Sequence, residues 1–203
     1  MTATLIVVII FCAVPLMSLL FYPAWASLYG MIKKKSVVPD RSFLPPVSII
    51  LACYNEEAYI QKKIESILSE EEWIPGSELI IVSGGSTDRT NEILAEYKEH
   101  IHIVVILKDE RVWKIEGVNL AVKRSIHPFL VFSDCRQEMK PGSIKRLVNN
   151  FSDPSVGTVT ATLVDTKLSK KPSFFRTLLN YVSRKESESS SCLNVYGALY
   201  AQR

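Results

Sequence analysis

An apolar run that ends abruptly in polar residues, Val47 to Asn55, constrains the fold of this chain more than any other stretch. It reads VSIILACYN, and Glu56 and Glu57 follow at once, where an amphipathic helix pattern begins. A short, continuously apolar run is typical of a parallel strand buried on both faces. Open α/β sheets bind ligands where such a strand stops before a helix. The free N–H groups and positive dipole end of the helix face that crevice.

Strands and helices alternate along the rest of the chain. We predict further strands at 79–82, 101–107 and 129–132, a more exposed edge or antiparallel strand at 159–163, and a last strand at 195–201. We predict helices at 57–69, around 93–97, over 115–126 with Ile115, Val118, Val122 and Ile126 inward, from Pro141 to about 151, and over 174–187. This alternation predicts an α/β fold with a mostly parallel sheet and helices on both faces.

The first 32 residues contain no Asp, Glu, Lys or Arg. About 20 apolar residues in a helix span a bilayer core, and Leu5 to Leu28 supplies that length. Aromatic residues gather near the end of the run, and Lys33, Lys34 and Lys35 follow. The positive-inside rule then places the rest of the chain in the cytoplasm, anchored to the inner or plasma membrane. The alternative is a cleaved signal peptide, because Ala24-Trp25-Ala26 looks like a cleavage site, but no basic residue precedes the apolar run.

Composition narrows the classes of function. A net charge of +3 over 203 residues does not indicate nucleic-acid binding by phosphate neutralisation. The four cysteines are isolated from one another, so we interpret them as small thiols in a reducing compartment rather than as metal ligands. Neither the dinucleotide fingerprint G-x-G-x-x-G nor the P-loop pattern occurs.

Polar residues follow three of the predicted strands and should meet at one edge of the sheet. They are Tyr54-Asn55-Glu56, Ser83-Gly84-Gly85-Ser86 and Ser133-Asp134. The glycines allow a ligand to approach the backbone closely. Asp134 could hold Mg²⁺ or Mn²⁺ against phosphate oxygens, which would stabilise a diphosphate leaving group. The alternatives are structural: Asp134 as a turn cap, Asn55 as a helix N-cap and Lys114 as a solvated helix residue.

The order of these segments resembles the family 2 glycosyltransferases with the GT-A fold, especially the membrane-anchored, polysaccharide-synthase-like members. The resemblance rests on VSIILACYNEE, IIVSGGSTDRT, K-x-x-x-x-N and VFSDCRQ in sequence, and covers about Pro46 to Arg203. It implies a nucleotide-diphospho-sugar donor such as a UDP- or GDP-sugar, a divalent cation (Mg or Mn), and sugar transfer with inversion. The implied acceptor is a glycan or a lipid-linked molecule, for cell-surface polysaccharide synthesis.

The resemblance also assigns roles to residues. It implies that the nucleotide-sugar is held by Ala52, Tyr54, Glu56, Ser83, Gly84, Asp88 and Lys114, and that Asp134 binds the metal as the first Asp of a D-x-D motif. The segment from Asn194 to Arg203, with Gly197, looks like the acceptor side.

Three departures from the family pattern bear on activity. Gly84 stands where the family's nucleoside-contacting Asp lies, and Arg136 replaces the second carboxylate of D-x-D and could offset diphosphate charge instead. An inverting transfer needs a general base, which the family pattern places beyond Arg203; Glu186 and Glu188 do not match it. We therefore expect a fragment with little or no activity alone, because the base is missing.

The predicted organisation is a transmembrane anchor at 1–32, a linker at 33–46 and a GT-A glycosyltransferase domain at 47–203, incomplete at its C-terminus. The rival hypothesis is a non-catalytic, membrane-tethered GT-A-like relic that binds a nucleotide or a partner. A nucleotidyltransferase of related architecture fits less well, since a glycine-rich basic loop after the first strand is missing from ACYNEE.

Overall fold

The chain forms two compact units, Met1–Ser36 with Leu163–Asn194, and Val37–Thr162 with Val195–Arg203. A computed structural model describes residues 2–32, 37–164, 174–189, 192, 195 and 197–203. The second unit contains the sheet.

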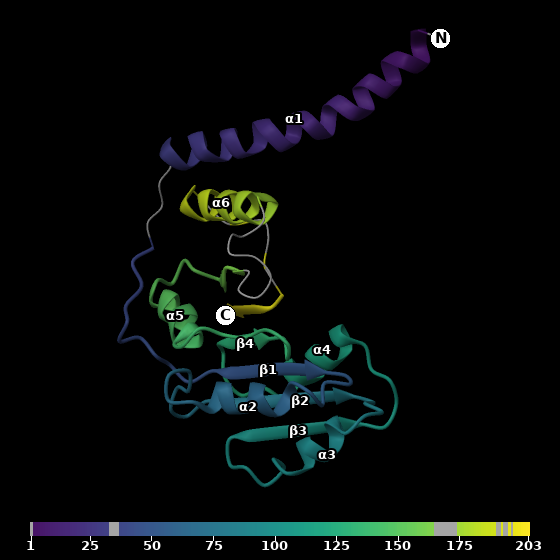
Figure 1. Ribbon diagram of the computed structural model, residues 1–203. Coiled ribbons are helices and arrows are strands. Elements are labelled where there is room, and N and C mark those ends of the chain that lie inside the picture. The colour runs from purple at the N-terminus through teal and green to yellow at the C-terminus, as the bar shows by residue number, and fades with distance from the viewer. Residues whose placement is uncertain (1, 33–36, 165–173, 190–191, 193–194, 196) are drawn as a thin grey trace. The chain divides into compact units, whose positions relative to one another are not determined.

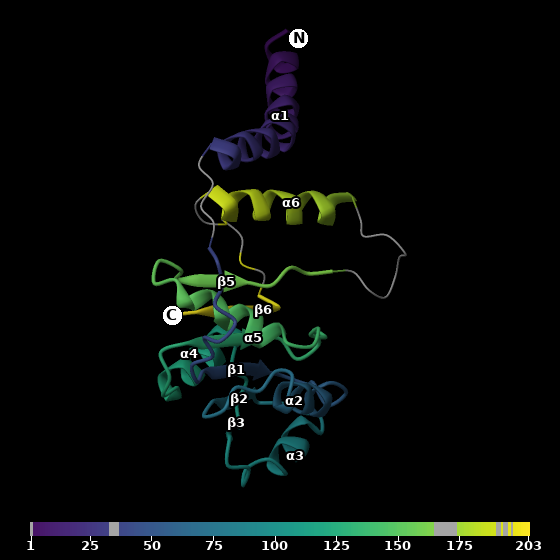
Figure 2. The same cartoon turned by 90° about the vertical axis from the view of Figure 1, so that its left-hand side faces the viewer.

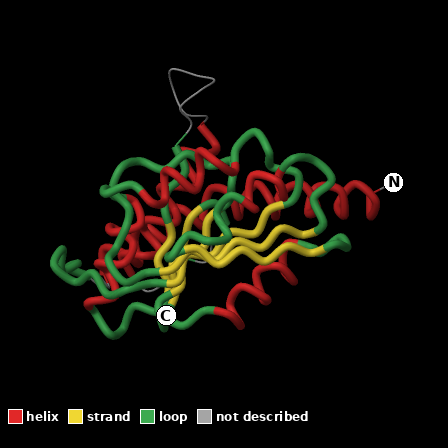
Figure 3. The backbone as a smooth tube through the Cα atoms, turned by 90° about the horizontal axis from the view of Figure 1, so that it is seen from below, coloured by secondary structure: helices red, strands yellow, loops and turns green. Residues whose placement is uncertain are grey.

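The second unit is built on a six-stranded sheet in the order β3-β2-β1-β4-β6-β5, which Figures 1 and 2 show from two sides. The strands are β1 (Ser48–Cys53), β2 (Glu78–Gly84), β3 (Ile103–Lys108), β4 (Leu130–Ser133), β5 (Thr158–Thr160) and β6 (Leu199–Gln202). β1 to β4 are parallel, whereas β6 runs antiparallel to both β4 and β5. The predicted α/β class is confirmed, and so is the edge strand around Val159. Figure 3 shows the strands running side by side in a twisted sheet.

Successive side chains of β1 enter two different cores, because strand residues alternate between the faces of a sheet. Ile49 and Leu51 belong to the larger core, which also contains buried side chains of α2 (Ile60–Leu68), α3 (Thr90–Ala95) and α5 (Ser143–Val148). Ile50 lies in a smaller core with Ala121 of α4 (Lys114–Arg124). The short 3₁₀ helix η1 (Asn149–Ser152) continues α5. Helices therefore cover both faces, as predicted.

Two predicted helix starts are wrong. Asn55 does not cap α2, which begins at Ile60; residues 56–59 form a turn in which Glu56 O accepts the N–H groups of Tyr59 and Ile60, both at 2.9 Å. Asn55 instead has a left-handed backbone (φ 53°). The second wrong start is Pro141, which was predicted as the first residue of a helix. The helix α5 begins two residues later, after Gly142 in a left-handed conformation (φ 74°).

The predicted inward face of α4 is also partly wrong. Ile115 and Ile126 are 78% and 70% exposed, and the buried residues of the helix are Gly117 and Ala121. A Cβ on Gly117 would lie 3.6 Å from both Ala52 and Val82. Because these two residues are small, α4 can lie close to the sheet. The larger predicted residues lie elsewhere: Val118 and Val122 are partly buried beside the helix–sheet contact, and Ile115 and Ile126 are exposed to solvent.

The first unit consists of α1 (Thr2–Ile32) and α6 (Phe174–Ser189), which lie against each other. The Tyr22 hydroxyl donates a hydrogen bond to Glu186, and the hydroxyls of Ser27 and Tyr181 lie 2.8 Å apart. Within the described residues, we find no helix with both the length and the apolar character needed to cross a bilayer. The membrane anchor stays a prediction.

Candidate functional site

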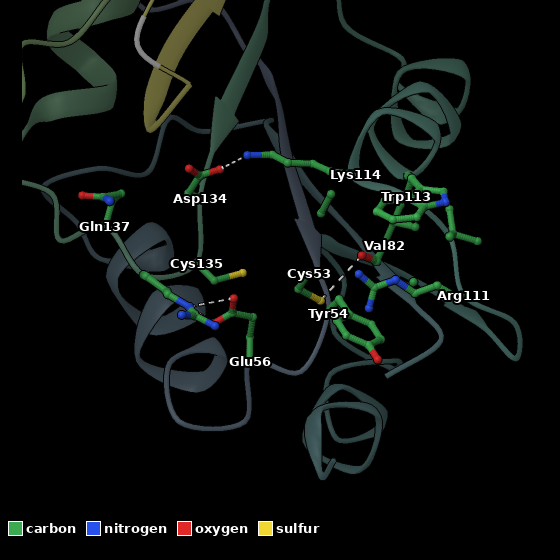
Figure 4. A pocket seen from close by; sticks show the side chains of 15 residues that line it. Cys53, Tyr54, Glu56, Val82, Arg111, Trp113, Lys114, Asp134, Cys135 and Gln137 are labelled. Carbon is green, nitrogen blue, oxygen red and sulfur yellow. Dashed lines mark hydrogen bonds and ion pairs between the residues drawn. The ribbon is translucent and has the colours of Figure 1, made fainter. Parts of the chain in front are cut away.

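A cavity of about 380 Å³ lies at the carboxyl edge of the parallel strands. The strand register places Cys53 of β1 opposite Ser83 of β2, and Leu51 opposite Ser133 of β4. The residues that follow these strands therefore share one edge, as predicted. The lining consists of Ala52, Cys53, Tyr54, Glu56, Val82, Gly84, Arg111, Val112, Trp113, Lys114, Gly117, Asp134, Cys135, Arg136 and Gln137. Figure 4 shows these side chains around the opening.

One side of the cavity is formed by two ion pairs, Lys114 with Asp134 and Arg136 with Glu56. We call these four residues the charged side. Lys114 Nζ lies 2.5 Å from Asp134 Oδ1, so the first residue of α4 contacts the turn after β4. Arg136 Nε donates to both carboxylate oxygens of Glu56 at 2.9 Å, which raises the pKa of the guanidinium. Both pairs are drawn as dashed lines in Figure 4. The side chains of Lys114 and Arg136 are 61% and 63% exposed, so they have room to move.

The opposite side is formed by Tyr54, Arg111, Val112, Trp113 and Gly84, and we call it the packed side. The Arg111 guanidinium carbon lies 3.2 Å from the centre of the Tyr54 ring and 5.5 Å from that of Trp113. These distances are within the range of cation–π attraction. These planar groups lie close together and give this side a surface on which a planar ligand can stack.

Close backbone contact explains why glycine occupies positions 84 and 85. A Cβ on Gly84 would lie 2.5 Å from Val112 O, and one on Gly85 would lie 2.5 Å from Glu110 O. Val112 N also donates to Gly84 O at 3.2 Å. The loop 110–112 thus occupies the space that a side chain at position 84 would need, and a carboxylate cannot fit there without moving it.

Ser83 and Asp88, both predicted nucleotide ligands, do not line the cavity. Ser83 is fully buried and its hydroxyl donates to Asn91 Oδ1 at 2.6 Å. Asp88 accepts hydrogen bonds from the backbone N–H groups of Thr90 and Glu57. Burial alone would raise the pKa of Asp88, but a hydrogen bond with the Thr90 side chain, together with those from the backbone N–H groups, lowers it. Their contact with a nucleotide stays a prediction.

Asn55 connects the first two strand-end loops. Its side-chain oxygen accepts from Thr87 N at 2.8 Å and its amide donates to Thr87 Oγ1 at 3.1 Å, while its own N–H donates to Ser86 Oγ. The left-handed backbone of Asn55 aims these groups at the second loop, so the residue fixes the two loops to each other beside the cavity.

A buried lysine lies behind the charged side. Lys63 of α2 is 4% exposed, and its Nζ donates to Gln137 O at 2.8 Å. Burial lowers the pKa of Lys63 to about 8, although Cys135, Asp134 and Glu72 act in the opposite direction. Its ammonium therefore remains mainly protonated at neutral pH.

The thiols of Cys53 and Cys135 are both free and buried at the floor of the cavity, as the sequence interpretation expected. Hydrogen bonding with Cys53, with burial, raises the pKa of Cys135 far above its usual range. The Cys135 thiol is therefore neutral. Cys192 is half-buried.

The strand β6 runs beside Asp134. The backbone N–H of Asp134 donates to Ala198 O at 3.1 Å, and the Tyr200 ring stacks on Phe132 at 4.5 Å between ring centres. Gly197 precedes this contact, and among the described residues other than its chain neighbours no atom lies within 4 Å of where its Cβ would be. Asn194 lies outside the described residues. The predicted acceptor side at 194–203 stays a prediction.

The groups around Asp134 do not fit the divalent cation that the resemblance implies. Asp134 and Glu56 are the carboxylates lining the cavity, and each is paired with a cation. Across the described part of the chain, no three His, Cys, Asp or Glu side chains are grouped as metal ligands. A hard cation prefers several oxygen ligands, but the second position of the D-x-D pattern carries the Arg136 guanidinium.

Sequence reasoning found most of the charged side and missed most of the packed side. Tyr54, Glu56, Gly84 and Asp134, which follow or end the strands, line one cavity together with Ala52, Lys114 and Arg136, which the family resemblance had indicated. Arg111 and Trp113 were not predicted, and the sequence signal for them was weak: they lie in a charged loop without a repeating pattern. Their role comes from the contact of this loop with Gly84, which only the fold shows.

Comparison with known proteins agrees with this geometry. Residues 48–198 match the family model described as Glycosyl transferase family 2. The chain is 28% identical over 157 residues to a poly-beta-1,6-N-acetyl-D-glucosamine synthase of Staphylococcus epidermidis, covering 70% of this chain and 38% of the relative. A Staphylococcus aureus synthase of the same name is 26% identical over 159 residues. The chain thus spans about two fifths of the length of these curated relatives.

Two solved structures share the fold. A mannosyltransferase from Pyrobaculum calidifontis, in complex with GDP-Man and Mn²⁺, superposes with a TM-score of 0.79 at 25% identity, covering 96% of this chain and 54% of that one. S. aureus TarS, in complex with UDP-GlcNAc, has a TM-score of 0.53 at 20% identity, covering 64% of this chain and 37% of that one. The second likeness supports the fold alone.

Proposed function

Because the chain belongs to glycosyl transferase family 2, we propose that its cavity binds a nucleotide-diphospho-sugar and takes part in transferring the sugar, with inversion, to a glycan or lipid-linked acceptor. The observation that carries this proposal is the convergence of Tyr54, Lys114, Asp134 and Arg136, from three separate segments, on one cavity at the strand ends. Ligands of open α/β sheets bind in this position.

The two sides of the cavity suit the two parts of such a donor. The flat surface of Tyr54, Arg111 and Trp113 suits a nucleobase, since aromatic rings and guanidinium planes stack on its faces. Lys114 and Arg136 on the charged side suit a diphosphate, because charge-assisted hydrogen bonds to phosphate are strong. The orientation that follows places the base beside Gly84 and the sugar toward Asp134 and β6. UDP- and GDP-sugars remain the candidate donors.

A titration of the chain with UDP, GDP and their sugars tests donor binding. We expect saturable binding, and a rise in melting temperature with nucleotide concentration, because a ligand that binds only the folded state stabilises it. Lys114→Met should weaken binding, since it removes a phosphate-binding charge without changing the fold. Absence of binding by folded protein would contradict the proposal.

A non-catalytic relic is the second candidate, and two features favour it: Gly84 leaves no room for the family's nucleoside-contacting carboxylate, and Arg136 replaces a metal ligand. Release of nucleotide and sugar transfer in an assay with membrane extracts as acceptor would decide against the relic. The expectation that this chain alone transfers sugar weakly or not at all stays a prediction, as does the divalent cation.

Membrane association of residues 1–32, with the sheet unit in the cytoplasm, also stays a prediction. It rests on an uncharged α1 followed by Lys33, Lys34 and Lys35, and on stacked aromatic rings near the end of α1, with Trp25 and Tyr29 at 5.2 Å. Extraction of cell membranes at alkaline pH tests it: an anchored chain stays in the pellet, whereas a peripheral one enters the supernatant.

A further inference from the structure

The charged side contains more cations than a divalent metal site allows. Lys114 forms an ion pair with Asp134, and Arg136 forms one with Glu56; these are the two carboxylates that line the cavity. The ammonium of Lys63 lies behind the same turn, on Gln137 O. A metal at Asp134 would have to displace Lys114 and would face two further positive groups. Like charges that share a partly buried site oppose each other.

We propose that the cations Lys114 and Arg136 take the place of the divalent metal, so that this site binds the diphosphate of its donor without a metal ion. The proposal rests on the proposed function, since it concerns the donor of that same cavity. On binding, Lys114 and Arg136 exchange their carboxylate partners for phosphate oxygens. Each phosphate of the donor carries a negative charge, so two mobile cations balance it.

The Lys114 and Arg136 side chains are largely exposed to solvent, so they can move from their carboxylate partners to a phosphate. Their carboxylate partners are less exposed, 33% for Asp134 and 14% for Glu56, against 61% and 63% for the two cations. The carboxylates thus hold the cations at the cavity until a phosphate replaces them. The planar guanidinium of Arg136 can donate hydrogen bonds to two phosphate oxygens at once, whereas the Lys114 ammonium acts as a point charge. After the exchange, the Asp134 carboxylate and the Lys63 ammonium still attract each other, which offsets part of the carboxylate charge.

Arg111 adds a further positive charge on the opposite side. Among the described residues that line the cavity, it is the cation that contacts aromatic rings rather than a carboxylate. The lining side chains therefore carry three cations against two carboxylates. This excess attracts an anionic ligand and repels a metal ion.

Titration calorimetry of the 203-residue chain with GDP and with UDP, each in EDTA and in Mn²⁺, tests the proposal. We expect the dissociation constant of the nucleotide that binds to be the same in both conditions. Arg136→Gln and Lys114→Met should each weaken binding in EDTA by about tenfold or more, which is the usual loss for a charge-assisted hydrogen bond. Arg184→Gln, which removes a cation from an exposed ion pair on α6, is the matched control and should bind as the unmodified chain does.

The variant Arg136→Asp gives the sharpest contrast, because it creates a second carboxylate two residues after Asp134. We expect it to bind nucleotide poorly in EDTA and to recover affinity with Mn²⁺. Binding by the unmodified chain only in the presence of Mn²⁺ would overturn the proposal while leaving donor binding intact. A lack of binding in both conditions would overturn the proposed function together with this inference. Circular dichroism of each variant confirms that it is folded.

Discussion

The two sides of the cavity are built from different interactions. On the charged side, Lys114 and Arg136 reach Asp134 and Glu56 through long, mostly exposed side chains. On the packed side, the loop 110–112 lies against the backbone of Gly84 and Gly85, with no space for even a Cβ. The charged side can change partners when a ligand arrives, whereas the packed side can only be distorted. Substitutions on the charged side should therefore affect mainly ligand binding, whereas substitutions on the packed side should affect stability as well.

The largest effect should come from placing the family's carboxylate on the packed side. In Gly84→Asp the new Cβ would lie 2.5 Å from Val112 O, so the loop 110–112 must move away and the new charge would be buried. We expect a loss of about 3 kcal/mol in the free energy of unfolding, measured by urea denaturation.

The control for this substitution is Gly117→Ala on α4, whose Cβ would make ordinary contacts at 3.6 Å with Ala52 and Val82. Alanine favours a helix over glycine by up to about 1 kcal/mol, so this variant should be as stable as the unmodified chain or more so. If Gly84→Asp were as stable as the unmodified chain, the loop 110–112 would be able to move aside at little cost. The packed side would then be as adaptable as the charged side.

Lys63 lies behind the charged side and differs from the cations on it, because it is buried and affects stability. Its pKa is lowered from the ordinary 10.5 to about 8, chiefly by burial, with Cys135, Asp134 and Glu72 opposing the shift. Between these two values the unfolded chain binds more protons than the folded one, so this group makes stability rise as pH increases from about 8 to 10.5. Below pH 8 its charge opposes folding in full, by about 3 kcal/mol.

Urea denaturation at pH 7 and pH 10 measures this effect as a difference between variants. In the unmodified chain, we expect the free energy of unfolding to rise by about 2–3 kcal/mol between pH 7 and pH 10 because of Lys63, and Lys63→Met should lose this rise. Lys62→Met, its neighbour on α2, is the control, since the Lys62 side chain is 77% exposed and should leave the profile unchanged. Parallel profiles for Lys63→Met and the unmodified chain would mean that the Lys63 ammonium is not desolvated.

The same contrast explains which parts of the molecule the sequence could predict. Runs such as Val47–Cys53 and the strand ends after them depend on local pattern, so the sheet and its parallel centre were predicted correctly. The binding roles of the residues on the charged side stay a prediction. The inward face of α4 was not predicted correctly, because Gly117 and Ala121 carry no hydrophobic signal and become buried only through close packing on Ala52 and Val82.

The packed side was missed for a related reason. Gly84 was interpreted as a departure from the family pattern, and only the contact with Val112 O gives it a physical cause. Arg111 lies far from Tyr54 in sequence, and no spacing rule relates a loop after β3 to the end of β1. Such long-range contacts depend on how the loops fold over the sheet edge.

A smaller effect is expected for the cation–π contact of the packed side. Arg111→Gln and Tyr54→Leu each remove the contact at 3.2 Å, and a double-mutant cycle in urea should give a coupling of about 0.5–2 kcal/mol. Tyr54→Phe keeps the ring and should keep most of the coupling. A cycle with no coupling would mean that Arg111 and Tyr54 are independent in solution, and the stacking surface would then have to form on ligand binding.

The smallest effect on stability should be that of the Arg136–Glu56 ion pair. Arg136 is 63% exposed, and solvent weakens the attraction in exposed ion pairs. We expect a cycle of Arg136→Gln and Glu56→Gln to give a smaller coupling than the cation–π cycle, and 1 M salt should reduce it further, because screening acts over about 3 Å at that ionic strength. The Arg111–Tyr54 coupling should change less with salt, since ring and guanidinium are in direct contact. If the ion pair proved stronger than the cation–π contact and insensitive to salt, Arg136 would be held too tightly to exchange Glu56 for a phosphate, and the charged side would be as fixed as the packed one.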